Sequence, residues 1–250
     1  MTRFAHVPVA DPGTPERQWQ RWGLSFPALD LSACERMVVV APHPDDEVLG
    51  VGGLMALAVA AGTRVDVVAV TDGELSHSSS RTVTAAELRR VRPIETERAL
   101  AELGLTAPPV RLGIVDGEVT RSESEVSAAL ADMLAGTRAG TWCVGTWDGD
   151  GHPDHDATGR ACRAAAAATG ATLVSYPVWM WHWAQPDDPD VPWQRARSIP
   201  LPEPVLAAKK AAVQHFSSQI TSPPSEPDLS PVVPPHVLDR LLRRSETMFV

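Results

Sequence analysis

Apolar runs and helical patterns alternate through the middle of the chain. Five segments are predicted strands: 37–41, 64–71, 110–114, 141–146 and 172–178. The first, MVVVA, is a continuous apolar run, the form of a strand buried on both faces. Helical patterns follow the predicted strands at 47–61, 85–103, 122–134 and 156–168. Pro93 is expected to kink the second helix or to mark its start. This alternation predicts an α/β fold, a three-layer α/β/α Rossmann-like sandwich around a mostly parallel sheet.

The flanks of this alternation differ from its centre. Thirteen of the 23 prolines fall between Pro177 and Pro235, which predicts loops around short elements. The first 35 residues are expected to form an arm or lid that lies on the rest of the protein. We therefore expect residues 1–250 to form a single domain with residues 1–35 as its N-terminal arm.

Charge and cysteine content restrict the partners and the compartment. The chain has 22 basic and 31 acidic residues, a formal net charge of −9. Because no basic stripe opposes this charge, we expect neither nucleic acid nor an anionic membrane as the main partner. No apolar run reaches the roughly 18 residues of a membrane span, and the first residues do not resemble a secretory signal. Three cysteines without a CxxC motif predict free buried thiols and a cytoplasmic protein.

Imidazole and carboxylate side chains follow the first and the fourth predicted strands. The segment 42–47 reads PHPDDE, and the segment 152–155 reads HPDH. Since the carboxyl ends of parallel strands open on one edge of a sheet, we expect the two loops to face each other. One such motif alone often caps a helix, but two at strand ends indicate a metal site. His43, Asp46 and His155 would bind zinc and leave a position open for water, as in catalytic sites.

Other side chains of these loops have predicted catalytic roles. Asp45 lies beside the ligands and is expected to act as the general base that takes a proton from metal-activated water. His152 is expected to stabilise an oxyanion or to donate a proton. Asp154 is expected to hold the His152 imidazole in the required tautomer. Replacing Asp45 by Asn should then leave the metal bound and abolish activity.

These motifs resemble the PIG-L/LmbE family of zinc-dependent N-deacetylases. The resemblance covers about residues 37–220, including a TDGE segment at 71–74, and leaves 221–250 as a C-terminal extension. It implies the same zinc ligands, base and electrophilic histidine as the residues themselves suggest. It also implies two substrate-binding residues, for which Arg92 and Asp116 are the matches, the latter as a contact to sugar hydroxyls.

The resemblance implies the removal of an N-acyl group, by default N-acetyl, from an amino sugar or its conjugate. In the tryptophan-rich tract 177–183, Trp181 is the candidate for stacking against a sugar ring or an apolar group of the substrate, while the other tryptophans are expected to pack in the core. Exposed tryptophans within 179–193 are a candidate surface for a homo-oligomer.

Three other interpretations are weaker. Two histidines and one carboxylate also bind Fe(II) in oxygenases, but those that share the HxD spacing are built on jelly rolls. A sugar-binding protein without catalysis is a second alternative. The glycines at 50–53 suggest dinucleotide binding, yet they begin past the strand end, and Met55 stands where the last glycine belongs.

Overall fold

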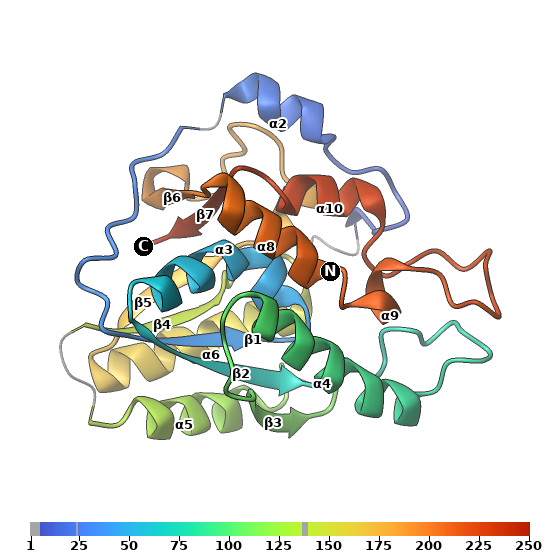
Figure 1. The fold of residues 1–250 in the computed structure, drawn as a ribbon, viewed down its shortest axis with the longest axis horizontal. Helices are drawn as coiled ribbons and strands as arrows, with labels where there is room; N and C mark the ends of the chain where they lie inside the picture. The colour runs from blue at the N-terminus through green and yellow to red at the C-terminus, as the bar shows by residue number, and fades with distance from the viewer. Residues whose placement is uncertain (1–5, 24, 137–139) are drawn as a thin grey trace.

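The computed structural model describes residues 6–23, 25–136 and 140–250. These residues form one sheet in the order β3-β2-β1-β4-β5-β7-β6, with helices on both faces (Figure 1). Its strands are β1 (Arg36–Ala41), β2 (Arg64–Thr71), β3 (Val110–Ile114), β4 (Thr141–Thr146), β5 (Thr172–Tyr176), β6 (Ala196–Pro200) and β7 (Ser245–Phe249). The longer helices are α3 (Asp46–Ala60), α4 (Ala85–Glu102), α5 (Glu123–Leu134), α6 (Pro153–Thr169) and α8 (Glu203–Val213). Shorter ones are α2 (Glu16–Trp22), α7 (Met180–Trp183), α9 (Ser217–Ile220), α10 (Pro235–Leu241) and the 3-10 turn η1 (Trp193–Arg195).

The predicted α/β class and the mostly parallel sheet are confirmed. Strands β1 to β5 pair in parallel, with β1 between β2 and β4. Strands β2, β3 and β4 have the predicted bounds. Pro93 lies inside α4 and does not mark its start. No helix in the described parts of the chain is long and apolar enough to cross a bilayer.

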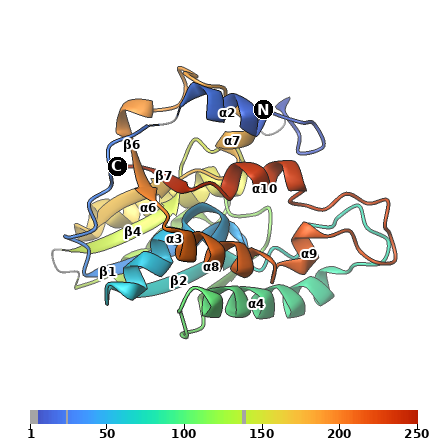
Figure 2. The same ribbon diagram turned by 45° about the horizontal axis from the view of Figure 1, so that its top comes forward.

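The C-terminal part of the sheet is antiparallel and was not predicted. Strand β7 pairs with β6 along its length and with β5 at Phe249. From the sequence, residues 221–250 are expected to lie outside the core as an extension. The structure instead inserts β7 from this segment between β5 and β6, and Figure 2 shows β7 beside β6.

Successive side chains of the central strands enter two different cores. Val38 and Val40 of β1 pack with residues of α5 and α6. Met37 and Val39 pack on the opposite face, with residues of α3, α4 and α8. Because both faces of the strand are covered, all four side chains are fully buried, which explains the uninterrupted apolar run in the sequence.

Helix α3 is broken in its middle, where Val51 has φ −138° and ψ 23°. The Glu246 carboxylate accepts the backbone N–H groups of residues 53–54, at 2.7 and 2.8 Å, where the second half begins. Lys209 Nζ donates to the carbonyl oxygen of Leu49 at 2.8 Å, where the first half ends, and to Glu246 Oε1 at 2.7 Å. The pair thus binds backbone groups that the break leaves without helical partners. The carboxylate lies at the N-terminal end of the second half and the ammonium group at the C-terminal end of the first half, where the helix dipoles favour these charges.

The N-terminal arm packs over the tryptophan-rich tract. The ring of Trp19 lies 5.1 Å from that of Trp181, and the rings of Trp22 and Trp193 are 4.8 Å apart. Trp19 also donates from its indole nitrogen to the carbonyl oxygen of Trp181 at 3.1 Å. The N-terminal arm of the same chain therefore covers Trp181 and Trp193, two tryptophans of the segment 179–193 that was predicted as an oligomer interface.

Candidate metal centre and active site

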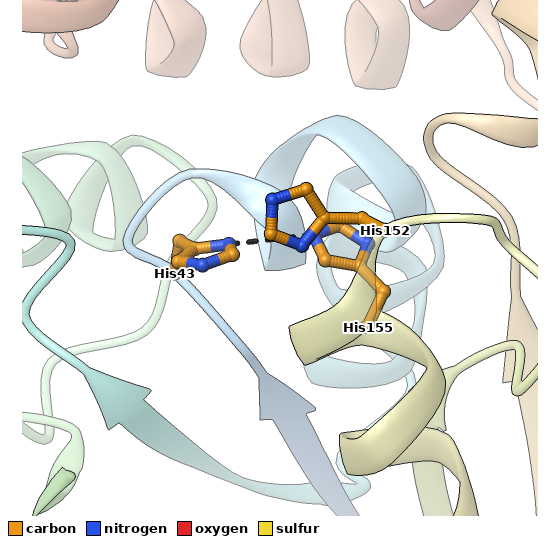
Figure 3. Close-up of side chains that lie close together, drawn as sticks. All are labelled: His43, His152 and His155. Carbon is orange, nitrogen blue, oxygen red and sulfur yellow. Dashed lines mark hydrogen bonds between the residues drawn. The ribbon is translucent and has the colours of Figure 1, made fainter. Parts of the chain in front are cut away.

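Three donor atoms converge at the carboxyl edge of β1 and β4. Asp46 Oδ2 lies 3.2 Å from His43 Nδ1 and 3.1 Å from His155 Nε2. The two imidazole nitrogens are 3.3 Å apart (Figure 3). Ligands about 2.05 Å from a tetrahedral zinc ion lie about 3.3 Å from one another. The geometry of the three predicted ligands therefore fits a single ion of this size.

The turn after β1 brings two of these groups together. The backbone N–H of His43 donates to Asp46 Oδ2 at 3.0 Å, which fixes the carboxylate at the start of α3. Between them, Asp45 has φ 121°, a conformation rarely adopted by residues other than glycine. Its backbone N–H is bound by Glu47 Oε2 at 3.2 Å. Strain of this kind is typical of functional loops.

The outer nitrogens of the two candidate ligand imidazoles, His43 and His155, face carboxylates. His155 Nδ1 lies 2.8 Å from Asp150 Oδ2. His43 Nε2 lies 3.2 Å from Asp116 Oδ1 and 3.3 Å from Asp154 Oδ2. A carboxylate beside the outer nitrogen accepts a hydrogen bond from the N–H there, which leaves the lone pair of the inner nitrogen free for a metal.

Asp150 is a further site residue, which the sequence motifs do not predict. It is fully buried, and besides His155 it accepts the backbone N–H groups of residues 178–180, each at 2.9 Å. It thus fixes the orientation of His155 and anchors the segment after β5. Its one signal in the sequence is its position in an acidic loop five residues before His155.

The charges of the centre favour a cation. Burial lowers the pKa of His155, but the neighbouring carboxylates of Asp46 and Asp150 together outweigh this effect and raise the pKa to about 9. Burial likewise opposes protonation of His43, whose pKa is nevertheless raised well above its usual value by Asp116, Asp154 and Asp46. Without a metal, the protonated imidazoles therefore balance the charge of the carboxylates, and a divalent cation would displace these protons.

Asp45 lies beside the donor triangle, outside it. Burial raises its pKa to about 7, although the charge of Arg92 acts to lower it. Arg92 Nη2 lies 3.3 Å from Asp45 Oδ2 and donates to the carbonyl oxygen of Pro44 at 2.5 Å. Its Nη1 donates to the carbonyl oxygen of Gly73 at 2.7 Å. A side chain at Gly73 would collide with this guanidinium, so the glycine permits the contact.

His152 lies against both ligand imidazoles, with ring centroids 5.1 Å from His43 and 5.0 Å from His155 (Figure 3). Its Nδ1 accepts the backbone N–H of Asp154 at 3.2 Å and caps helix α6. Burial, aided by the charges of the two other histidines, lowers the pKa of His152 to about 3. The ring is therefore neutral and carries its proton on Nε2.

The prediction that the Asp154 carboxylate holds the His152 ring is wrong. Asp154 Oδ2 lies 3.3 Å from His43 Nε2 and accepts the backbone N–H of Gly117 at 2.8 Å. Because Asp154 is the second residue of α6, its backbone N–H points back at the capping His152 while its side chain is directed to His43. It is the main chain of Asp154 that sets the His152 tautomer.

The centre opens into a cavity of about 540 Å³. Predicted site residues on its wall are His43, Asp45, Asp46, Arg92, Asp116 and His152. Trp181, which was predicted to contact the substrate, does not line the cavity. Trp179 lines it instead. Positions two apart on a helical turn face different directions, and Trp181 instead packs on Trp19 with the Arg243 guanidinium 4.2 Å above its ring.

Comparisons with known proteins identify relatives of this arrangement. A family model described as PIG-L, GlcNAc-PI de-N-acetylase, matches residues 38–166, half of the chain. A 1D-myo-inositol 2-acetamido-2-deoxy-alpha-D-glucopyranoside deacetylase of Thermobifida fusca is 28% identical over 226 residues, which cover 80% of this chain and 73% of that protein. The protein of the same name from Mycolicibacterium vanbaalenii is 33% identical over 158 residues, which cover 54% and 55% of the two chains. The N,N'-diacetylchitobiose deacetylase of Pyrococcus horikoshii shares the fold, with a TM-score of 0.60, 21% identity and coverage of 79% of this chain and 76% of that one.

Proposed function

The chain belongs to the PIG-L family, and from this premise we propose that it is a zinc-dependent hydrolase that removes an N-acyl group from an amino sugar or its conjugate. The observation that carries the proposal is the triangle of His43, Asp46 and His155 with a buried carboxylate, Asp45, directly beside it. The relatives named as deacetylases of acetamido sugars support the same reaction.

The zinc-binding residues, Asp45 and His152 have separate roles in the proposed reaction. A zinc ion held by His43, Asp46 and His155 would polarise the acyl carbonyl and acidify a water molecule. Asp45 accepts the proton of the attacking water, a task that suits a carboxylate with a pKa near 7. His152, neutral and protonated at Nε2, donates a hydrogen bond to the developing oxyanion. Asp45 then returns its proton to the departing amine.

The flanking residues have supporting roles. Asp116 lies on the cavity wall, with Oδ2 accepting the backbone N–H of Leu75 at 2.9 Å, and we assign it to the sugar hydroxyls. The terminal nitrogens of Arg92 are bonded to protein oxygens, so we assign Arg92 to holding Asp45 in place rather than to binding substrate. The three cysteines are unpaired and buried, which supports a cytoplasmic location.

A free-amine assay over a panel of N-acetyl amino sugars and their conjugates tests the proposal. We expect activity that a chelator abolishes and zinc restores. Asp45→Asn should keep its zinc, measured by elemental analysis, and lose about 10²- to 10⁴-fold in kcat. Asp132→Asn is the control, because Asp132 is an exposed carboxylate of α5 away from the cavity.

Three outcomes would contradict the proposal. Loss of zinc from Asp45→Asn would make Asp45 a ligand rather than the base. Activity that requires Fe(II) and dioxygen would favour an oxygenase. Sugar binding without hydrolysis in the zinc-loaded protein would leave a binding protein.

A further inference from the structure

The active-site cavity has two chemically different halves. The residues around the metal centre are polar, as described above, apart from Leu75, whose backbone N–H donates to Asp116. The other half is lined by side chains of which none is more than 7% exposed: Leu49, Val178, Trp179, Val233, Val237 and Leu241. The polar side chains Gln219, Ser230 and His236 also border the cavity. A buried wall of this composition suits an extended apolar group of a ligand.

The sheet order separates the two halves. Arg92 and Asp116 belong to elements that follow β2 and β3, on one side of the metal centre. The segment 178–179 follows β5, on the other side of β1 and β4. Helix α10, which carries Val237 and Leu241, packs against α3 and α7 above this second side (Figure 2). The metal centre thus lies between a polar side and an apolar side.

An amide held at this centre must extend in both directions. Its carbonyl carbon carries the amine component on one side and the acyl chain on the other. The sugar, with its hydroxyls, suits the side of Asp116, and the acyl chain then enters the side of Trp179. An acetyl group offers only one methyl to this wall, whereas the apolar residues extend from α3 to α10.

We propose, on the basis of the proposed function, that the substrate carries an N-acyl chain longer than acetyl and that this chain lies in the apolar half of the cavity. Hydrolysis breaks the amide C–N bond. The hydroxyl of water goes to the acyl carbon and its proton to the nitrogen. The products are a fatty acid and a free primary amine.

The test is a series of glucosamine conjugates with one aglycone and N-acyl chains from acetyl to decanoyl, assayed with the zinc-loaded protein. We expect kcat/KM to rise by about fourfold per methylene until the apolar half is filled, and so by about 250-fold from acetyl to hexanoyl if all four added methylenes are buried. The dissociation constants of the same compounds for the Asp45→Asn variant, measured by calorimetry, should fall as the acyl chain becomes longer.

A variant that fills the apolar half sharpens the test. Val237→Phe should reduce the hexanoyl-to-acetyl ratio of kcat/KM by at least about tenfold, because the larger ring occupies the space of several methylenes. Leu238→Phe is the matched control, since Leu238 is the next residue of α10 and does not line the cavity. Its ratio should equal that of the unmodified protein.

The outcomes separate this inference from the proposed function. If no conjugate is hydrolysed, the proposed function fails. If acetyl is removed faster than every longer chain, only the inference is overturned. A second series keeps the acetyl group and lengthens an apolar aglycone, and a gain confined to that series would assign the apolar half to the aglycone and overturn the inference.

Discussion

The buried pair of Lys209 and Glu246 should stabilise the break in α3, and removing one charge tests this directly. Lys209→Met keeps the length of the side chain but deletes the ammonium group. The carbonyl oxygen of Leu49 then loses its donor, and the Glu246 carboxylate loses its counter-ion. Glu246→Gln is the reciprocal change, which leaves the ammonium without a carboxylate.

The expected magnitude follows from burial. Lys209 is fully buried and Glu246 is 5% exposed, so water cannot solvate the charge that remains. Removing one partner of such a pair costs about 3–5 kcal/mol. This is a large part of the roughly 5–15 kcal/mol by which folded proteins are stable. The double variant contains neither charge, so its loss should be at least about 2 kcal/mol smaller than the sum of the two single losses.

Urea unfolding followed by tryptophan fluorescence measures these free energies, since the chain has eight tryptophans. The exposed pair of Arg244 and Glu203, 3.2 Å apart with side chains 79% and 67% exposed, is the control. Arg244→Met should cost less than about 1 kcal/mol. A loss below about 1 kcal/mol for Lys209→Met, or single losses that add in the double variant, would refute the reasoning.

Three further predictions concern the rest of the molecule. Burial raises the pKa of Cys34 to about 11, so iodoacetamide at pH 8 should modify it about 100-fold more slowly than an ordinary thiol, as mass spectrometry can check. Glu226 binds the backbone N–H of Arg81 at 3.0 Å and joins two loops beside the cavity; Glu226→Gln should speed tryptic cleavage after Arg81, and an unchanged rate would contradict this contact. Arg240 donates to carbonyl oxygens of the N-terminal arm, whose residues 9–10 line the cavity. Arg240→Gln should therefore raise KM in steady-state assays, whereas a fall in kcat alone would argue against an anchoring role.

The parts of the fold that local patterns determine could be predicted. Strands β2 and β4 have uninterrupted or nearly uninterrupted apolar runs because helices cover both faces of the sheet. The convergence of the loops 42–47 and 152–155 could be predicted because parallel strands present their carboxyl ends on one edge. The start of α6 was placed three residues late, at 156, because the HPDH segment was treated as loop, whereas His152 caps the helix and Pro153 begins it.

The parts that depend on distant partners could not be predicted. Which tryptophan reaches the cavity is decided by the N-terminal arm, since Trp19 packs on Trp181 and leaves Trp179 at the wall. Strand β7 was missed for a related reason. Its sequence, SETMF, contains Glu246 at a position that is buried in the sheet, whereas most carboxylates in proteins face water. Glu246 can be buried only because Lys209, far away in the sequence, and the break in α3 provide its partners, so no local pattern could reveal this strand.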